Sequence, residues 1–190
     1  MRWSILASIL FLAAATPAAV AAQTPSEAAV LYRDMKVRAE AGDAEAQWEI
    51  GMMLLNGDGV TRNEREAWRW VRASGDAGHE KGMISTAVML ALGQGTAPDP
   101  AQARDWYRRA AERHGSAHAL RGLAGMLITG EGGAADPTLG AAYLELASEA
   151  GDAYAARILE AIGPELAEQV DRRKVDSLKS DWVARHGRPD

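Results

Sequence analysis

The chain has 190 residues, of which 47% are apolar and 25% are charged, and its net charge is −5. This composition is typical of a folded domain, and the negative charge argues against binding to nucleic acid or to an anionic membrane surface. Cysteine is absent, which excludes disulfide bonds and thiolate chemistry, so the fold must be held by its own core.

The first 22 residues have the layout of a secretory signal peptide. Arg2 precedes an apolar run over about residues 3–15, and small residues lie before the expected cleavage after Ala22 or a neighbouring alanine. The run is shorter than the ~20 residues that span a bilayer, so a retained anchor is the less favoured alternative. We therefore expect a periplasmic or secreted protein without stable membrane insertion after cleavage.

A capping segment, residues 23–40, follows with a helix from about Pro25 to Glu40, and the chain then repeats itself. Glycines recur at separations of 36, 37 and 36, and turn glycines, polar cap residues and aromatic residues follow in register. These rows are Gly42, Gly78, Gly115 and Gly151; Gly57, Gly93 and Gly130; Asn63, Asp99 and Asp136; and Trp70, Trp106 and Tyr143. The predicted units are residues 41–76, 77–113, 114–150 and a partial unit, 151–162.

Each unit predicts two helices joined by a glycine turn. The first helix of unit one carries a single apolar stripe that includes Ile50 and Leu54. The turn glycines stand where a helix ends at positive φ, and the polar residues that follow them are predicted N-caps. Since one helix pair cannot bury its apolar face alone, the units must stack, which predicts an all-α solenoid with Trp70 and Trp106 in its core.

The last segment, residues 163–190, predicts one capping helix followed by a tail. It starts at Gly163-Pro164, and an apolar residue recurs at multiples of four positions, at Leu166, Val170, Leu178 and Trp182. The rest of this helix is strongly charged, as expected of a terminal helix with one solvated face.

The repeated motifs resemble the Sel-one-like repeat, a relative of the tetratricopeptide repeat. The resemblance covers roughly Ala41 to Ile162 and is carried by "AGDAEAQWEIGMMLLNGDGV", "AQARDWYRRAAERHGSAHALRGLAGML" and "GAAYLELASEAGDAYAARILEAI". Thr96 and Gly133 depart from the valine of the motif, and Tyr143 departs from its tryptophan. The resemblance implies a right-handed α-solenoid of an exported bacterial protein, with capping helices at both ends and first helices that line a concave face.

The implied function is a non-catalytic scaffold or adaptor in the bacterial cell envelope that binds a protein or peptide on this concave face. The charge along the face runs from acidic to basic, which suits an extended peptide, although these side chains could also be ordinary surface residues. The candidate partner-binding residues are Glu45, Glu49, Met52, Lys81, Ser85, Val88, His118, Arg121, Tyr154 and Arg157.

The main alternative is an enzyme, and the chain lacks the motifs that would favour one. The turn "GDG" follows no predicted strand and recurs in each unit, so it is a structural turn rather than a phosphate loop. No serine lies in a G-x-S-x-G or S-x-x-K context. His114 and His118 have a metal-ligand spacing, but Gly115 separates them at a turn. We expect no enzyme activity, cofactor or metal; the alternative is a protein that binds or hydrolyses peptidoglycan or β-lactams.

Overall fold

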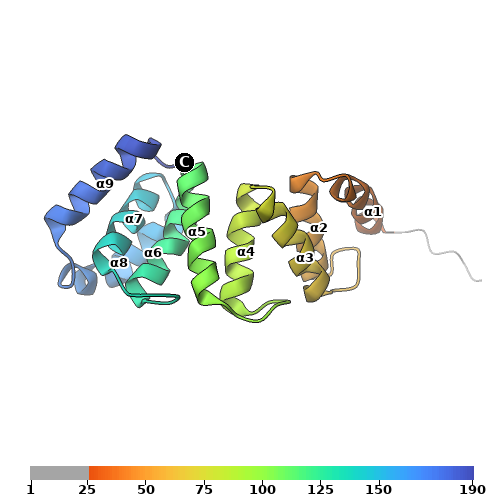
Figure 1. The fold of residues 1–190 in the computed structure, drawn as a ribbon, viewed down its shortest axis with the longest axis horizontal. Helices are drawn as coiled ribbons and strands as arrows, with labels where there is room; N and C mark the ends of the chain where they lie inside the picture. Colours follow the sequence, from red (N-terminus) through yellow and green to blue (C-terminus); the bar gives the residue numbers. More distant parts are fainter. Residues whose placement is uncertain (1–25) are drawn as a thin grey trace, which may run out of the picture.

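The computed structural model describes residues 26–190, so the predicted signal peptide and the start of the capping segment lie outside the described residues. Within this range the protein has nine helices and no strand, which confirms the all-α prediction. Figure 1 shows the helices stacked along one long axis, with α1 at one end and α8 and α9 at the other. The helices are α1 (Glu27–Glu40), α2 (Ala44–Asn56), α3 (Glu64–Asp76), α4 (Glu80–Leu92), α5 (Pro100–His114), α6 (Ala117–Thr129), α7 (Pro137–Glu149), α8 (Ala153–Ala167) and α9 (Arg172–His186).

The turns have the conformations that the repeat predicts. The glycine that ends α2, α4 and α6 has a φ of 84°, 70° and 75°, at Gly57, Gly93 and Gly130. The side chain of each predicted N-cap accepts a hydrogen bond from the backbone N–H three residues later, at Asn63, Asp99 and Asp136. These contacts satisfy groups that the helix ends would otherwise leave unpaired. The glycine turns are therefore structural joints of the repeat.

The second glycine of each turn fixes how one unit rests on the previous one. A Cβ atom at Gly95 would lie 2.0 Å from the backbone oxygen of Glu64, at the start of α3. A Cβ atom at Gly59 would lie 2.3 Å from the backbone carbon of Ala28, at the start of α1. Ala28 and Glu64 are 36 positions apart in the chain. The capping helix α1 thus occupies the place of a second helix in a preceding unit.

Small residues let neighbouring helices approach closely. Gly82 in α4 lies against α3, where an added Cβ atom would be 2.3 Å from Ser74 Oγ and 2.7 Å from the backbone nitrogen of Gly75. The small residues at the equivalent position of the second helices, Ser74, Ala110 and Ala147, are fully buried. The side-chain volume between the helices is therefore small, and the stack is held by close contact of backbones.

The repeat-row tryptophans differ in their burial. Trp106 is 2% exposed and lies in the main core, as predicted. Trp70 is only half-buried and packs at the edge of the N-terminal core cluster. Trp68 lies outside the repeat row, yet it packs against both clusters and connects them. The prediction of a core position is confirmed for Trp106 and holds only in part for Trp70, because only α1 lies beyond α2 and α3 at that end.

The prediction of one C-terminal helix that starts at Gly163 is wrong. Helix α8 runs through Gly163 and Pro164 to its end at Ala167, and α9 starts separately at Arg172. Asp171 caps α9, because its Oδ1 accepts hydrogen bonds from the backbone N–H groups two and three residues later. A proline is compatible with the start of a helix and also with an existing helix that bends or ends nearby. Here the carboxylate cap determines where the new helix begins.

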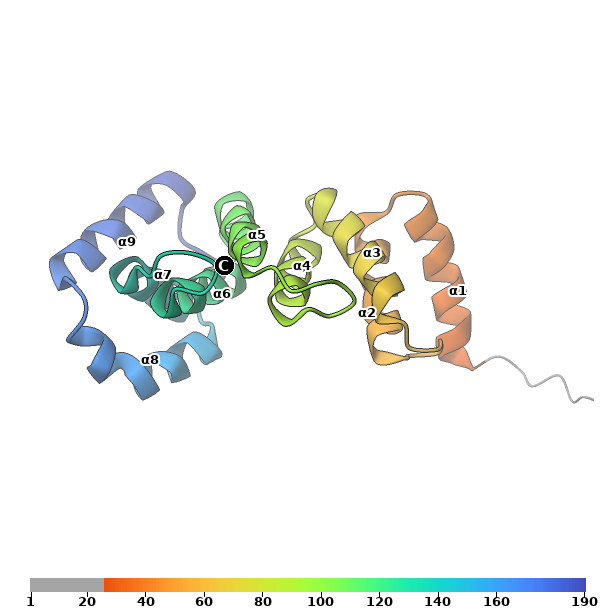
Figure 2. The same cartoon turned by 60° about the horizontal axis from the view of Figure 1, so that its bottom comes forward.

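Helix α9 packs on α7 rather than forming a regular pair with α8. Figure 2 shows α7 between α8 and α9, and each of them contacts α7. Leu166 and Val175 are buried in a third core cluster with α7 residues. The chain end then returns to the turn between α5 and α6, where Ala117 N donates to Asp190 O at 2.9 Å (Figure 1). Because α9 packs on α7 and not along α8, most of α8 is exposed.

Candidate functional site

All ten predicted binding residues lie on α2, α4, α6 and α8, and none is buried. We call the accessible surface of these four helices the first-helix face. Its exposed members are Glu45, Lys81, His118, Tyr154 and Arg157, and its half-buried members are Glu49, Met52, Ser85, Val88 and Arg121.

Two of these residues meet around a tryptophan that the repeat pattern did not place. The indole Nε1 of Trp48, on α2, donates a hydrogen bond to Ser85 Oγ on α4 at 3.0 Å. Lys81 Nζ lies 4.9 Å from the centre of the Trp48 ring, and the His79 ring lies 6.2 Å from it. A cation over an indole ring is an electrostatically favourable pair. This Trp48 cluster, formed by Trp48, His79, Lys81 and Ser85, joins two units across the face.

Glu49 and Met52 line a cavity of about 350 Å³ between α1 and α2. Methionine and leucine side chains form much of its wall, and Arg38 of α1 adds a positive charge that pairs with Asp43 at 2.6 Å. The hydrogen bond that Arg38 donates to Asp43 raises the pKa of Arg38. The remaining lining residues are Leu31, Met35, Trp48, Met53 and Asp58. The capping helix therefore contributes to this surface, and its arginine interrupts the predicted change from acidic to basic.

The other end of the face carries a second cation–aromatic group, the Tyr154 cluster of Arg121, Asp152, Tyr154 and Arg157. Arg121 Nε donates to Asp152 Oδ2 at 2.9 Å, and the Asp152 side chain is 1% exposed. The guanidinium carbons of Arg121 and Arg157 lie 5.4 and 5.7 Å from the Tyr154 ring centre. Tyr154 itself is 64% exposed. An aromatic ring is thus held at the surface between two positive charges.

Asp152 is the structural anchor of this cluster. Its Oδ1 accepts hydrogen bonds from the backbone N–H groups of Tyr154 and Ala155, so it caps α8 while it pairs with Arg121. Burial raises the pKa of the carboxyl, but the hydrogen bonds from Ala155 and Arg121 outweigh burial and leave the pKa below its usual value. The carboxylate is therefore charged near neutral pH and fixes the end of α8 to α6.

The structure does not bring the remaining predicted residues together. Within residues 26–190, the side chains of Glu45 and His118 form no hydrogen bond or ion pair, and Val88 is a half-buried residue of α4. His114 ends α5, and its Nε2 lies 3.0 Å from Gly78 O, whereas His118 lies on α6.

Neither a metal site nor a membrane span is found in the described part of the chain. No group of three or more histidine and carboxylate side chains there could hold a metal ion. None of the helices in the same range has the length and hydropathy required to cross a membrane.

Comparison with known families identifies the repeat. The Sel1 repeat model matches residues 44–79, 81–114 and 117–152, which together make up more than half of the chain. The protein belongs to the Sel1 repeat family. This is the predicted Sel-one-like family, and its members are generally non-catalytic scaffolds for protein–protein interaction.

Two relatives of this Sel1 repeat protein are named exopolysaccharide production negative regulator. They come from Rhizobium leguminosarum bv. viciae and Rhizobium meliloti (strain 1021) and are 32% and 33% identical to the chain over 138 and 142 residues. The alignments cover 66% and 68% of this chain but 51% and 52% of the relatives. The chain thus spans about half the length of these relatives.

Solved structures confirm the solenoid fold. A Sel1 repeat protein from Oxalobacter formigenes has a TM-score of 0.60 and 33% identity, with coverage of 67% of this chain and 96% of that protein. The protective antigen c5321 of uropathogenic Escherichia coli has a TM-score of 0.58 and 19% identity, with coverage of 87% and 42% respectively. At this identity the second structure supports the fold alone.

Proposed function

We propose that this Sel1 repeat protein is a non-catalytic adaptor of the bacterial cell envelope that binds an extended segment of a partner protein on its concave, first-helix face. The observation that carries the proposal is the 64% exposed ring of Tyr154, held between the guanidinium groups of Arg121 and Arg157. Tyrosine and arginine are enriched among the residues that contribute most to protein interfaces. The hydrogen bonds of Asp152 order this cluster before any partner arrives, which lowers the entropic cost of binding.

The charges on α4 and α8 favour a partner segment that carries acidic residues there, and the cavity beside α2 favours apolar ones. Lys81 and Arg157 have no ion-pair partner within residues 26–190, so both can pair with carboxylates of a partner. The cavity between α1 and α2 is lined by methionines, which adapt their shape to varied apolar side chains. One segment that crosses the face would thus meet an apolar cavity at one end and two arginines, Arg121 and Arg157, at the other.

The proposed location and biological role rest on two further observations. The signal-peptide layout of the first 22 residues supports export to the periplasm or the medium. The names of the Rhizobium relatives support a role for this protein in which the partners it binds are proteins that control exopolysaccharide production. We propose that the protein acts as a regulator in this way, through binding rather than turnover.

The binding face is tested by a charge reversal with a matched control. Tagged protein is used to capture partners from envelope extracts, and the partner recovered is purified and titrated against Lys81→Glu/Arg157→Glu. We expect the affinity to fall by about tenfold or more, because two charged contacts are lost. The control, Arg65→Glu/Arg173→Glu, makes the same charge change at exposed positions of α3 and α9. Equal affinities for the two variants would overturn the assignment of the face.

Export is tested separately by mass spectrometry of the protein from cell fractions. The proposal predicts a periplasmic or secreted form that starts at Gln23 or a neighbouring residue. A form that retains residues 1–22 and stays in the cytoplasmic fraction would contradict the envelope location without affecting the binding face.

A further inference from the structure

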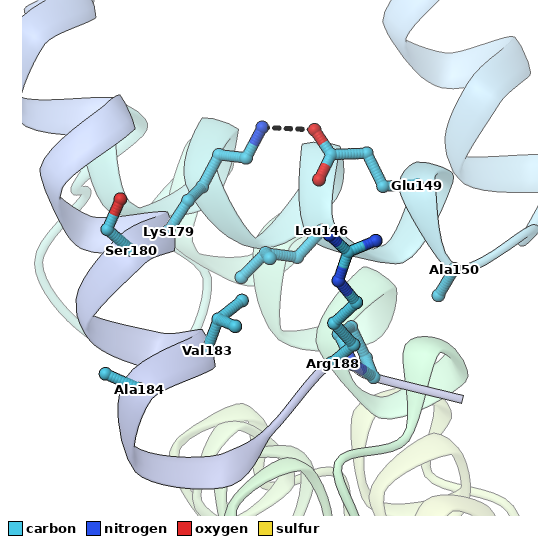
Figure 3. Close-up of a pocket in the computed structure, with 9 residues that line it drawn as sticks. Leu146, Glu149, Ala150, Lys179, Ser180, Val183, Ala184 and Arg188 are labelled. Atoms are coloured by element: carbon cyan, nitrogen blue, oxygen red, sulfur yellow. Dashed lines mark hydrogen bonds and ion pairs between the residues drawn. The ribbon is translucent and has the colours of Figure 1, made fainter.

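A second cavity lies near the C-terminal end of the solenoid, between α7 and α9. It has a volume of about 510 Å³, within the ~300–1,000 Å³ typical of small-molecule sites. Leu146 of α7 and Val183 of α9 form apolar walls, and Figure 3 shows their side chains facing each other across it. This α7–α9 pocket is closed on one side by the tail after α9, through Arg188 and Pro189. It exists because α9 packs on α7.

The lysine and glutamate charges at the rim of the pocket already neutralise each other. Lys179 Nζ donates a hydrogen bond to Glu145 at 3.0 Å and another to Glu149 (Figure 3). Burial lowers the pKa of Lys179, but the hydrogen bonds to the two carboxylates outweigh burial and raise it. Arg172 adds a further ion pair to Glu145, at 3.1 Å. The ammonium group of Lys179 is therefore occupied and does not serve as a free cation for a ligand.

One charged side chain of the pocket remains available. Arg188 lines the cavity, and no ion pair of its guanidinium is found within residues 26–190. The tail that carries it is fixed on both sides, because Gly187 N donates to Val183 O at 2.9 Å and Asp190 O accepts from Ala117 N at 2.9 Å. Figure 3 shows the Arg188 side chain extending across the pocket toward α7. An apolar cavity is therefore combined with an exposed guanidinium that has no ion-pair partner in this range and stands on a fixed backbone.

We propose that the α7–α9 pocket binds a small amphipathic carboxylate, with its apolar body against Leu146 and Val183 and its carboxylate on Arg188. The guanidinium offers two parallel N–H donors, which match the two oxygens of a carboxylate. The carboxylate belongs either to a free aliphatic acid or to the end of a short peptide with an apolar last residue. The site is separate from the first-helix face and does not depend on the proposed function.

The test is calorimetric titration of the protein with octanoate. We expect saturable binding, weakened about tenfold by Arg188→Gln because the charged hydrogen bonds are lost. Arg173→Gln makes the same charge change at an exposed position of α9 outside the pocket, and we expect its affinity to stay within about twofold of the wild type. Ala184→Glu places a carboxylate at an exposed position of the pocket wall and should abolish binding. Thermal unfolding of each variant verifies that the fold is kept.

Two further ligands separate the sources of the carboxylate. Octanol has the same chain without the charge and should bind about tenfold more weakly than octanoate. The tripeptide Ala-Ala-Leu is titrated with a free and with an amidated carboxyl end, and tighter binding of the free form than of octanoate would assign the pocket to peptide ends. No saturable binding of either carboxylate with a Kd below about 1 mM, or equal binding to wild type and Arg188→Gln, would overturn the proposal.

Discussion

The two ends of the solenoid are closed in different ways. At the N-terminal end, α1 takes the place of a second helix. The turn glycine Gly59 lies against the backbone of Ala28, as Gly95 lies against the backbone of Glu64. At the C-terminal end, α9 leaves the repeat geometry and packs on α7 (Figure 2), while most residues of α8 are exposed. At the regular end, α1 lines a cavity together with α2 of the first-helix face, and at the irregular end a separate pocket lies between α7 and α9. A repeat array can therefore acquire a new site where its last helix departs from the repeat.

The largest expected effect is at the irregular end. Trp182 is 2% exposed, and its ring lies 5.2 Å from the Tyr143 ring and 4.1 Å from the His186 ring. Trp182→Ala should lower the free energy of unfolding by about 3–5 kcal/mol, because a large cavity forms between α7 and α9. Denaturant titration measures this loss.

Trp182→Phe is the matched control for this prediction. The indole Nε1 of Trp182 is buried without a hydrogen-bond partner, so a phenyl ring removes an unsatisfied donor. We expect a loss smaller than that of the alanine variant, by roughly 2 kcal/mol or more. Equal losses for the two variants would show that the contacts of the ring do not hold α9 in place.

The regular middle of the array is tested at two helix glycines. Gly82→Ala forces a Cβ atom against Ser74 and the backbone of α3, and we expect a loss of about 1–3 kcal/mol. Gly125→Ala, on α6, meets nothing within 4 Å and should instead stabilise the protein by about 0.5–1 kcal/mol. Thermal unfolding distinguishes the two signs, and a loss in both variants would contradict close backbone contact as the specific cause.

The junction of α6 and α8 should depend on Asp152. Asp152→Ala removes the cap of α8 and the partner of Arg121, with an expected loss of about 1–2 kcal/mol. Since the pKa of Asp152 is lowered by folding, its contribution is present above the unfolded pKa and is lost as pH falls through the folded pKa. The stability of the wild type should thus fall more steeply below about pH 4 than that of the alanine variant. Parallel pH profiles of the two proteins would argue against a charged Asp152.

The smallest expected effect is at the hydrogen bond between α2 and α4. Ser85→Ala removes the acceptor of the Trp48 indole N–H, and we expect a loss of about 0.5–1.5 kcal/mol. Ser180→Ala, at an exposed position of α9, is the control and should change stability by less than about 0.5 kcal/mol. If the two losses are equal, the bridge from Trp48 does not stabilise the stack.

Repetition in the sequence explains which parts of the fold could be predicted. The turn glycines, the N-caps and the buried Trp106 follow from local rules that each unit obeys separately, and these predictions are confirmed. Repetition could not predict α9, because Gly163-Pro164 does not by itself distinguish a helix start from a helix interior. The period of the repeat also does not predict which side chains of neighbouring units contact each other.

The candidate site shows the same division. The ten predicted residues lie on accessible positions of the expected helices, since the repeat register alone fixes which side of a helix faces the core. The contribution of α1, through Arg38 and Met35, was missed because that helix carries no repeat motif. Trp48 stands outside the shared rows, and its bond to Ser85 spans 37 positions of the chain. An aromatic residue outside the rows of a repeat is the signal that could have indicated it.

The contacts of Gly59, Gly95 and Gly132 with α1, α3 and α5 bear on how such chains can change in length. Each glycine contacts the start of its helix, at Ala28, Glu64 and Pro100, and these contacted residues are 36 positions apart in the chain. The turn glycine of a duplicated unit inserted after α1 or α3 would contact the start of the helix before that unit in the same way. The second helix of the inserted unit would in turn accept the turn glycine of the unit that follows. At the C-terminal end α9 packs on α7 instead, so a unit duplicated within the array would leave the contacts at both ends unchanged.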